Sequence, residues 1–509
     1  MFLLSLLSSN FISSQLIYNI LTGLLTFWFV TYVIPTIKRL FTLPPGPWGL
    51  PFVGYLPYLQ KHHEYKDLDR LAKKYGPVYS LSLGKDTVIV VNDWDHAKEV
   101  FKSDDLLARP EGFGSNVDGA SILEMSGEPW RVHRQNTVHL LRDLGLGKSS
   151  FENKINEEIE EFLPKLEKGP VKNLFKTFLL TATNTVSILL LGHGFEDDDP
   201  VKQTLIDALE NASKIGSQFM IFKSGLPRKI ERLLIKPADL NLEVLGDYYQ
   251  QTMAIPKYMQ NEIDEHKKKQ SKEFEDYIDG YLKEQKKREN SDSNSNVSFT
   301  DKTLRSNMVT FYQAGSETVS TTLTWAILYL VKYPEYYEKI RAEISDVIGF
   351  ERLPDYSDRN QMPMTMAFIY EVHRAASIVG VNLFRAATRD LKIGNYNVPK
   401  GATVMVNFWT INHDPSLYIK PDEFDPSRFL TDNGTKAIKP PFLNPFSKGK
   451  RGCPGEGFAN VELFLYLVSI VQRYKIECEP GSTITFESDY VSTRKPISLP
   501  SLIFTKVSE

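Results

Sequence analysis

The segment Pro445-Phe446-Ser447-Lys448-Gly449-Lys450-Arg451-Gly452-Cys453-Pro454-Gly455 is a glycine-rich loop that leads into an apolar stretch, 458–474, predicted to be a helix. A thiol just before a helix start meets the positive end of the helix dipole and free backbone N–H groups. Arg451 adds a nearby cation, so the pKa of the Cys453 thiol is expected to be lowered, which favours metal binding. The three glycines would let the backbone pass close to a planar cofactor without Cβ collisions.

Five residues of this loop are spaced as F-x-x-G-x-R-x-C-x-G, and through them the chain resembles the cytochrome P450 superfamily. They are Phe446, Gly449, Arg451, Cys453 and Gly455. The resemblance implies that these residues hold haem b, with Cys453 as the axial thiolate ligand to the iron. It covers nearly the whole chain and implies a mainly α-helical fold with a small β region. A structural cysteine in a glycine-rich turn is the alternative interpretation of the loop taken alone.

Two further elements are expected to reach the haem propionates. Trp130 and Arg134 are four residues apart, which places an indole and a guanidinium on one face of a predicted helix. In the family such a pair hydrogen-bonds one propionate. Arg385, five residues before Asp390, matches a position where the family uses histidine or arginine to reach the other propionate. Taken alone, the Trp130 and Arg134 pair would be interpreted as surface packing.

Three charged residues resemble a structural network of the family. Glu371 and Arg374 form its E-x-x-R motif, a carboxylate and a guanidinium one helical turn apart that hold a meander loop. Arg428, in Phe424-Asp425-Pro426-Ser427-Arg428-Phe429, resembles the third member. Charges at these positions would be costly unless paired. We therefore expect the Glu371→Ala substitution to damage folding and haem retention more than chemistry.

A long apolar helix is predicted from about 302 to 331, interrupted in composition by Ala314-Gly315-Ser316-Glu317-Thr318. Gly315 in a helix interior costs roughly 1 kcal/mol relative to alanine, so something should require it. Close approach by a flat ligand is one such reason, and a kink or a tight helix crossing is the other.

The same five residues resemble the distal-helix motif of the family. The resemblance implies that Ala314 and Gly315 lie beside the haem and that Glu317 and Thr318 are catalytic. An axial thiolate favours O–O cleavage, which is heterolytic only if protons arrive, and an acid with an alcohol can deliver them. In many relatives another hydroxyl residue follows the threonine, whereas this chain has Val319.

The amino-terminal region predicts a membrane anchor. No charged side chain precedes Lys38, and the run 11–37 is long and apolar enough to cross a bilayer, which takes about 20 residues. The basic start and the small-residue cleavage site of a signal peptide are not clear. The predicted organisation is a single transmembrane helix within 1–37, a basic and proline-rich linker at 38–47, and a catalytic domain at 48–509. Basic residues after the span place that domain in the cytosol, at the endoplasmic reticulum membrane.

The composition is that of an ordinary globular protein, because 42% of the 509 residues are hydrophobic and 24% are charged. The net charge of −3 gives no basic field for binding nucleic acid. Only two cysteines occur, so the body is expected to face a reducing compartment. Cys478 lies in an alternating, strand-like stretch and is interpreted as a small, partly buried residue.

Local patterns predict the other elements of the body. Strands at 78–83 and 87–91 should flank a hairpin turn at 84–86. Amphipathic helices should dominate from 152 to 290. The polar, low-complexity stretch 286–298 is predicted to be an exposed loop.

The resemblance implies a monooxygenase that inserts one oxygen atom from O₂ into a lipophilic substrate. Electrons would come from NADPH through a membrane-bound NADPH-cytochrome P450 reductase, with cytochrome b5 as a further candidate partner. Arg131, Lys448 and Lys450 are expected on the thiolate side, where they could attract an acidic redox partner, although they could also be ordinary solvated charges. Substrate contacts are expected from 111–122, the region of Phe311 and Ala314, 378–383, and the region of Val491.

Two alternatives share the haem. The first is an isomerase or dehydratase that rearranges peroxides without a reductase, and the intact Glu317–Thr318 pair argues against it. The second is a non-catalytic haem-binding or sensor protein, which would need neither the distal threonine nor a membrane anchor. Oxygen consumption supported by NADPH and reductase, with product formation, separates both from a monooxygenase.

Overall fold

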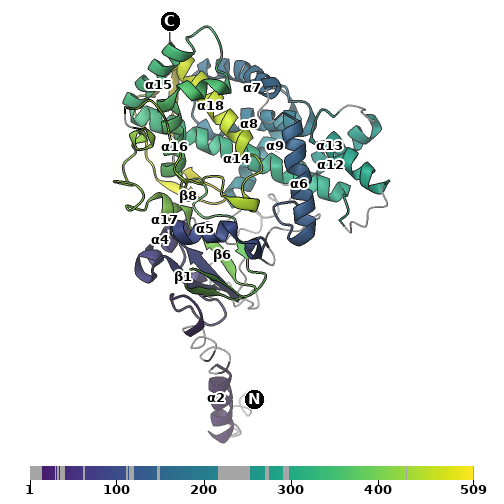
Figure 1. Ribbon diagram of the computed structural model, residues 1–509, viewed down its shortest axis with the longest axis vertical. Coiled ribbons are helices and arrows are strands. Elements are labelled where there is room, and N and C mark those ends of the chain that lie inside the picture. Colours follow the sequence, from purple (N-terminus) through teal and green to yellow (C-terminus); the bar gives the residue numbers. More distant parts are fainter. Residues whose placement is uncertain are drawn as a thin grey trace, which may run out of the picture.

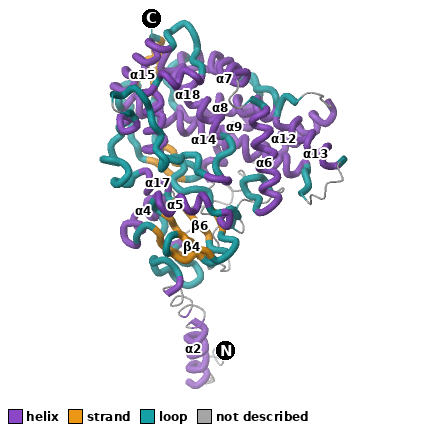
Figure 2. Tube along the Cα trace, viewed as in Figure 1, coloured by secondary structure: helices purple, strands orange, loops and turns teal. Residues whose placement is uncertain are grey.

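The computed structural model describes residues 14–28, 30, 34, 41–60, 63–110, 113, 120–145, 149–215, 253–269, 274–290, 297–431 and 433–507. Helices form most of the body, and the largest sheet lies at one end of it (Figure 1). Figure 2 shows the strands as small separate groups among the helices. The prediction of a mainly α-helical fold with a small β region is confirmed.

Fourteen α-helices are described within these residues. They are α2 (Ser14–Trp28), α4 (Glu64–Tyr75), α5 (Trp94–Lys102), α6 (Gly127–Asp143), α7 (Ser149–Phe162), α8 (Leu174–Leu191), α9 (Pro200–Ile215), α12 (Ala254–Lys269), α13 (Tyr277–Glu289), α14 (Asp301–Lys332), α15 (Pro334–Val347), α16 (Pro363–Ala376), α17 (Phe408–Asn412) and α18 (Glu456–Arg473).

The strands form one four-stranded sheet, in the order β1-β2-β6-β3, and three two-stranded ones, β7 with β10, β4 with β5, and β8 with β9. Their bounds are β1 (Val78–Leu83), β2 (Asp86–Val91), β3 (Arg385–Ala386), β4 (Leu391–Ile393), β5 (Tyr396–Val398), β6 (Thr403–Val406), β7 (Tyr474–Cys478), β8 (Ser488–Tyr490), β9 (Arg494–Pro496) and β10 (Leu502–Lys506).

The predicted hairpin is confirmed, with a turn shorter than expected. Leu83 pairs with Asp86 across the antiparallel β1–β2 ladder, which leaves only Gly84 and Lys85 to make the turn. Gly84 adopts φ +59°, a left-handed conformation that glycine reaches without steric cost. Strand β6 then adds to β2 in parallel, so a segment more than 300 residues further along the chain completes the sheet.

Helix α14 is the long helix predicted from 302 to 331, and it runs through the body (Figure 1). It begins after Thr300, whose hydroxyl oxygen accepts a hydrogen bond from the Thr303 amide at 3.1 Å. The helix packs against α8, α12, α16 and α18. Two of its buried hydroxyls are satisfied within the helix: Ser320 and Thr324 each donate to the carbonyl four residues earlier, at 2.6 and 2.7 Å.

One prediction in the helical region needs correction, and one helix departs from the dominant pattern. The stretch 286–298 is not a loop throughout, because α13 continues to Glu289 and only 297–300 is described as non-helical after Asn290. Basic residues in the last turn of α13 favour this extension, since cations stabilise the carboxyl end of a helix. Helix α8 is apolar rather than amphipathic, because it is buried on most of its surface.

The amino-terminal anchor is described only in part. Helix α2 lies outside the body, beyond the end that holds the four-stranded sheet (Figure 1). Its apolar segment, Tyr18–Phe27, is shorter than a membrane span. Among the described residues, the helix that is long and apolar enough to cross a bilayer is α8, but 78% of it is buried within the fold. The remainder of the predicted span lies outside the described residues.

Candidate functional site

The loop that carries Cys453 is closed by its own backbone. The Cys453 amide donates to the Phe446 carbonyl at 2.8 Å, and the Gly452 amide donates to the Gly449 carbonyl at 2.9 Å. Gly449 has φ +75°, and a Cβ there would lie 2.3 Å from the carbonyl oxygen of Phe101 in α5. The glycine is therefore required by the close approach of α5, before any cofactor is considered.

The other two glycines of the loop differ from Gly449. A Cβ on Gly452 would meet the Gly449 carbonyl at 3.1 Å, which is a contact within the loop itself. A Cβ on Gly455 would meet no protein atom closer than the Cys453 Sγ, at 3.9 Å. Protein packing thus explains two of the three glycines, and Gly455 is the one whose open face is available to a planar group.

The predicted direction of the thiol pKa is wrong. Burial raises the pKa of the Cys453 thiol, and the amide of Gly455 and the charge of Arg134 only partly offset this effect. The cation that acts on the sulfur is Arg134, not Arg451. The side chain nevertheless has accessible surface, so protein atoms do not cover the sulfur completely. A bound metal cation would keep such a thiol deprotonated.

Trp130 and Arg134 both lie on α6 and both reach the cysteine loop. Arg134 donates to the Gly452 carbonyl at 2.5 Å. Trp130 is buried, and the guanidinium of Arg451 lies 3.9 Å from its ring centroid. Surface packing is therefore excluded for this pair, since both residues help to fix the loop.

Arg451 and Arg385 are anchored by backbone carbonyls. Arg451 donates to the carbonyls of Leu107, Ile122 and Met125 at 2.9, 3.1 and 2.5 Å. Arg385, on β3, donates to the carbonyls of Val100 and Lys448 at 3.0 and 3.3 Å. Both guanidiniums are thus oriented by neutral acceptors that leave their charge uncompensated.

Arg109 lies near Arg385 and Arg451, and sequence reasoning missed it. Its guanidinium donates to the carbonyls of Leu123 and Phe384 at 2.8 and 2.7 Å. The Ala386 amide donates to the Ala108 carbonyl at 2.8 Å, and this bridge brings Arg109 beside β3. No local signal in the sequence could have found it, because the bridge joins segments more than 270 residues apart.

The four arginines form a group of like charge, in which Arg385 is buried and the other three are half-buried. Burial lowers the pKa of Arg109 well below its usual range, and Arg451, Arg385 and Arg134 add to the shift. Burial and the other guanidiniums lower the pKa of Arg451 to about 9, and burial lowers that of Arg385 to about 10. Across the described ranges, no carboxylate forms an ion pair with any of the four. Such a group fits a polyanionic ligand, and the two propionates of haem b have the required charge.

The distal-helix residues lie on α14. Ala314 is exposed although its helix packs against several others, and the Thr318 hydroxyl donates to the Ala314 carbonyl at 2.7 Å. Gly315 packs against α8, where a Cβ would lie 2.9 Å from a methyl group of Val186. A tight helix crossing therefore accounts for this glycine, and a contact of Gly315 with the cofactor stays a prediction.

Glu317 points to a partner that the sequence did not indicate. Its carboxylate accepts hydrogen bonds from the hydroxyls of Ser492 and, at 2.9 Å, Thr493. The ammonium of Lys495 lies 2.8 Å from the same Oε1 atom. Glu317 is thus held by the segment between β8 and β9, whereas Thr318 is bonded within α14.

The structure brings together the three residues of the predicted network. Glu371 is fully buried and binds Arg374 through both oxygens at 2.7 Å. Arg428 Nε lies 3.2 Å from the same carboxylate. Arg374 also donates to the carbonyls of Asn412 and Pro421 at 3.0 and 2.7 Å. One carboxylate and two guanidiniums therefore hold the segment 412–428 against α16.

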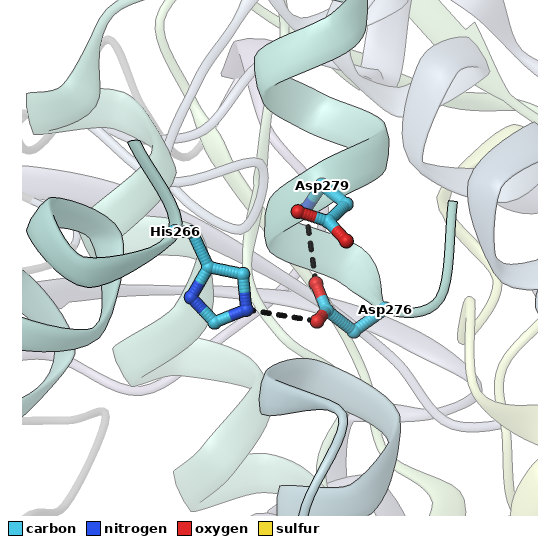
Figure 3. A group of neighbouring side chains, drawn as sticks. All are labelled: His266, Asp276 and Asp279. Atoms are coloured by element: carbon cyan, nitrogen blue, oxygen red, sulfur yellow. Dashed lines mark hydrogen bonds and ion pairs between the residues drawn. The ribbon is translucent and has the colours of Figure 1, made fainter. Parts of the chain in front are cut away.

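A second group of ionisable residues lies away from this site. His266, Asp276 and Asp279 approach one another where α12 ends and α13 begins (Figure 3). Both ring nitrogens of His266 have acceptors, the Glu262 carbonyl at 2.7 Å and Asp276 at 2.9 Å. Burial opposes a charge on this ring, but Asp276 outweighs it and raises the pKa of His266 to about 9. An imidazolium has no lone pair for a metal, so this group is an ion pair at a helix cap.

Comparison with known proteins agrees with the site. The sequence model of the cytochrome P450 family matches residues 44–500. Human cytochrome P450 2J2 is 30% identical over 475 residues, which cover 89% of this chain and 90% of that protein. Mouse cytochrome P450 2C39 is 32% identical over 449 residues, 86% of this chain and 88% of that protein. Dog cytochrome P450 2C41 is 34% identical over 445 residues, with the same two shares.

The chain belongs to the cytochrome P450 family. Members of this family are generally haem-thiolate monooxygenases, and the enzyme is a cytochrome P450 monooxygenase whose cofactor is haem b. When bound, the haem supplies activation of O₂ at an iron whose thiolate ligand favours cleavage of the O–O bond.

Proposed function

We propose that this protein hydroxylates a lipophilic organic substrate at the endoplasmic reticulum membrane, using electrons from an NADPH-dependent reductase. The overall reaction takes a C–H bond, O₂, two electrons and two protons, and gives a C–OH group and one water. The observation that carries the proposal is the group of four arginines without acidic partners beside the Cys453 loop. A chain that buries such charge needs an anionic ligand there.

Cys453 would be the axial ligand of the haem iron. Arg109, Arg134, Arg385, Arg451 and the indole N–H of Trp130 would hold the propionates. Phe446 packs edge-on against His373, with ring centroids 5.5 Å apart, and its carbonyl fixes the Cys453 amide. Ala314 and Gly455 would face the macrocycle, because neither has protein packed closely against it. Gly449 would act indirectly, by keeping the loop seated on α5.

Proton delivery would depend on Thr318 and Glu317. The Thr318 hydroxyl can donate or accept, and its present partner is the Ala314 carbonyl of its own helix, so a rotation of χ1 would free it. Glu317 would supply protons to this hydroxyl, and its ties to Ser492, Thr493 and Lys495 would have to loosen first.

The expected substrate contacts are largely apolar. Phe311 and Ala314 lie on α14, Leu383 is 39% exposed beside β3, and Val491 lies in the turn between β8 and β9. Of the region 111–122, only Phe113 and the last three residues are described. An apolar lining favours a lipophilic substrate, since burial of apolar surface drives binding.

Membrane attachment would use α2 and the surface beside it. The side chains of Leu21, Leu25 and Phe27 on α2 are exposed. Large apolar side chains are also exposed in the linker, Phe41 at 84%, and in the segment that follows it, Trp48 at 62%, Phe52 at 55% and Tyr58 at 47%. Aromatic residues of this kind are typical of membrane interfaces. They support contact of this end of the domain with the membrane surface, and the basic residues Lys38 and Arg39 after the span favour a cytosolic catalytic domain.

Docking of the reductase, and of cytochrome b5 as a second donor, would use the face that carries the cysteine loop. The three basic residues expected there already have neighbours. Lys450 lies 2.7 Å from Asp104, Arg131 lies 4.0 Å from Glu128, and the Lys448 ammonium lies 5.3 Å from the Trp94 ring. These contacts are exposed and weak, so an acidic partner could compete for the cations.

The test is a carbon monoxide difference spectrum of the reduced protein, compared with that of Cys453→Ala. We expect the band of a thiolate-ligated haem in the wild type and its loss in the variant. A band typical of histidine ligation that survives the substitution would contradict the assignment of the ligand. NADPH and reductase should then support oxygen consumption, and a screen of lipophilic compounds for shifts of the haem spin state would identify the substrate class.

A second candidate function is a reductase-independent isomerase or dehydratase. The observation that favours it is the ion pair of Glu317 with Lys495, because an acid fixed in this way does not deliver protons. Turnover of a lipid hydroperoxide without NADPH, together with no reductase-supported oxygen consumption, would select this alternative.

A further inference from the structure

Lys495 is a largely buried cation that the sequence motifs did not indicate. It lies in β9, and its ammonium is 2.8 Å from Glu317 Oε1. The side chains of both residues are largely buried, at 18% and 14% exposure. On its other side the ammonium lies 4.3 Å from the centroid of the Phe175 ring, in α8. Lys495 is thus enclosed between an aromatic face and the acid of the distal helix.

The backbone that carries Lys495 is fixed independently of Glu317. The neighbouring Arg494 is buried and donates to the carbonyls of Ala376 and Ala375 at 2.6 and 3.0 Å. Its own carbonyl accepts from the indole of Trp325, in α14, at 2.9 Å. The backbone at Lys495 is therefore fixed by contacts that do not involve Glu317.

The same segment provides the side chains that contact the Glu317 carboxylate. The hydroxyls of Ser492 and Thr493 donate to Oε1, the Lys495 ammonium forms an ion pair with it, and Thr493 also lies 3.4 Å from the Thr321 hydroxyl, one turn further along α14. Val491, one of the expected substrate contacts, begins this run of residues. The residues that contact the carboxylate are therefore one to four positions from Val491 in the chain.

We propose that Lys495 is a positioning residue that withholds Glu317 from proton delivery until the turn between β8 and β9 moves. This inference rests on the proposed function, because it concerns the acid of that reaction. In the resting protein the carboxylate accepts two hydroxyl hydrogen bonds and forms an ion pair with the ammonium. Removal of the ammonium leaves it with two hydroxyl donors and frees it to rotate toward Thr318.

The consequence is measurable without a known substrate. With reductase, NADPH and O₂ alone, two electrons and two protons release hydrogen peroxide, whereas four electrons and four protons release two waters. Release of water requires further protons at the site. Withholding Glu317 in the wild type therefore favours peroxide, and freeing Glu317 favours water.

The experiment compares purified holoenzyme with the Lys495→Met, Lys495→Arg, Glu317→Gln and Lys495→Met/Glu317→Gln variants. Lys475→Met is the matched control, since Lys475 forms an exposed ion pair with Glu477 on β7. The peroxide released per NADPH oxidised should fall about threefold in Lys495→Met. It should stay at the wild-type level in Lys495→Arg and Lys475→Met, and it should return to that level or above in the double variant.

Thermal unfolding of the same holoenzymes provides a readout besides turnover. Lys495→Met should lower the midpoint by about 3 °C, because a buried charge loses its partner. The double variant should lose less than the sum of the two single variants, as expected for residues in direct contact.

The outcomes separate the inference from the proposed function. Wild-type protein that carries a thiolate-ligated haem but oxidises no NADPH with the reductase would contradict the proposed function, and the inference with it. A functional wild type whose peroxide fraction is unchanged or raised in Lys495→Met would overturn the inference alone. A purely structural role of Lys495 predicts the lower unfolding midpoint without the change in peroxide, and that result would also overturn it.

Discussion

Two groups of guanidiniums in this protein differ in the source of the negative charge that balances them. Arg374 and Arg428 share the carboxylate of Glu371, at 2.7 and 3.2 Å, so their counter-ion comes from the chain itself. Arg109, Arg134, Arg385 and Arg451 have carbonyl acceptors, and within the described residues no acid pairs with them. Their pKa values are all lowered, chiefly by burial.

The difference distinguishes a group that stabilises the fold from a group that binds the cofactor. A paired group is complete when the chain has folded, and removal of its acid leaves two uncompensated charges. An unpaired group is complete only when an anion arrives from outside the chain. Substitutions in the first should therefore act on the protein with or without haem, and substitutions in the second should act mainly on the retention of haem.

The largest effect is expected for Glu371→Ala. Loss of the shared carboxylate leaves Arg374 and Arg428 buried without a counter-ion, and the free energy of unfolding should fall by about 3 to 5 kcal/mol, with or without haem. Urea denaturation of both forms measures this. Glu423→Gln is the control, because its exposed pair with Lys420 should contribute less than about 1 kcal/mol. Equal losses in the two variants would remove the distinction between the groups.

Arg385→Met tests the unpaired group. We expect haem to dissociate about 10 to 100 times faster, because a charge-assisted hydrogen bond to a propionate is lost. The haem-free protein should change in unfolding free energy by less than about 1 kcal/mol, since the variant removes an uncompensated buried charge. Haem transfer to an acceptor protein and urea denaturation measure the two quantities. A large loss of stability in the haem-free form would show that this group is also structural.

The glycines of the cysteine loop sharpen the comparison within one segment. Gly449→Ala should lower the free energy of unfolding by about 2 kcal/mol or more, because φ is positive and the Phe101 carbonyl occupies the Cβ position. Gly455→Ala should leave the haem-free protein almost unchanged and weaken haem binding. If both variants destabilised the haem-free protein equally, Gly455 would have a packing role that its open surroundings do not indicate.

The smallest effect is expected at His266, a paired cation outside both groups. Its pKa is about 9 in the folded protein and near 6.5 when unfolded, so its stabilisation is fully present below pH 6.5. That stabilisation is lost as pH rises through 9. The difference in unfolding free energy between wild type and His266→Gln should therefore shrink as the pH rises from 6.5 to 9.5. A constant difference over this range would mean that Asp276 does not stabilise a charged ring.

Sequence reasoning predicted the elements with strong local signals. The hairpin, the long helix α14, the helix after the cysteine loop and the strand that holds Cys478 all formed where their patterns placed them. The roles of residues within motifs depend on contacts with distant segments of the chain, so the sequence predicted them less well. Gly449 and Gly315 fit a flat cofactor by motif, yet their Cβ positions are filled by α5 and α8.

The sequence alone indicated the class of protein, because five spaced residues of the Cys453 loop resemble the motif of the cytochrome P450 family. The tertiary structure decided which charges that chemistry can use. It placed Arg109 beside Arg385 through a strand bridge, assigned Lys495 to Glu317, and raised the thiol pKa by burial against the expected direction. Electrostatic energies depend on distance and on exclusion of water, and neither quantity is written in the local sequence.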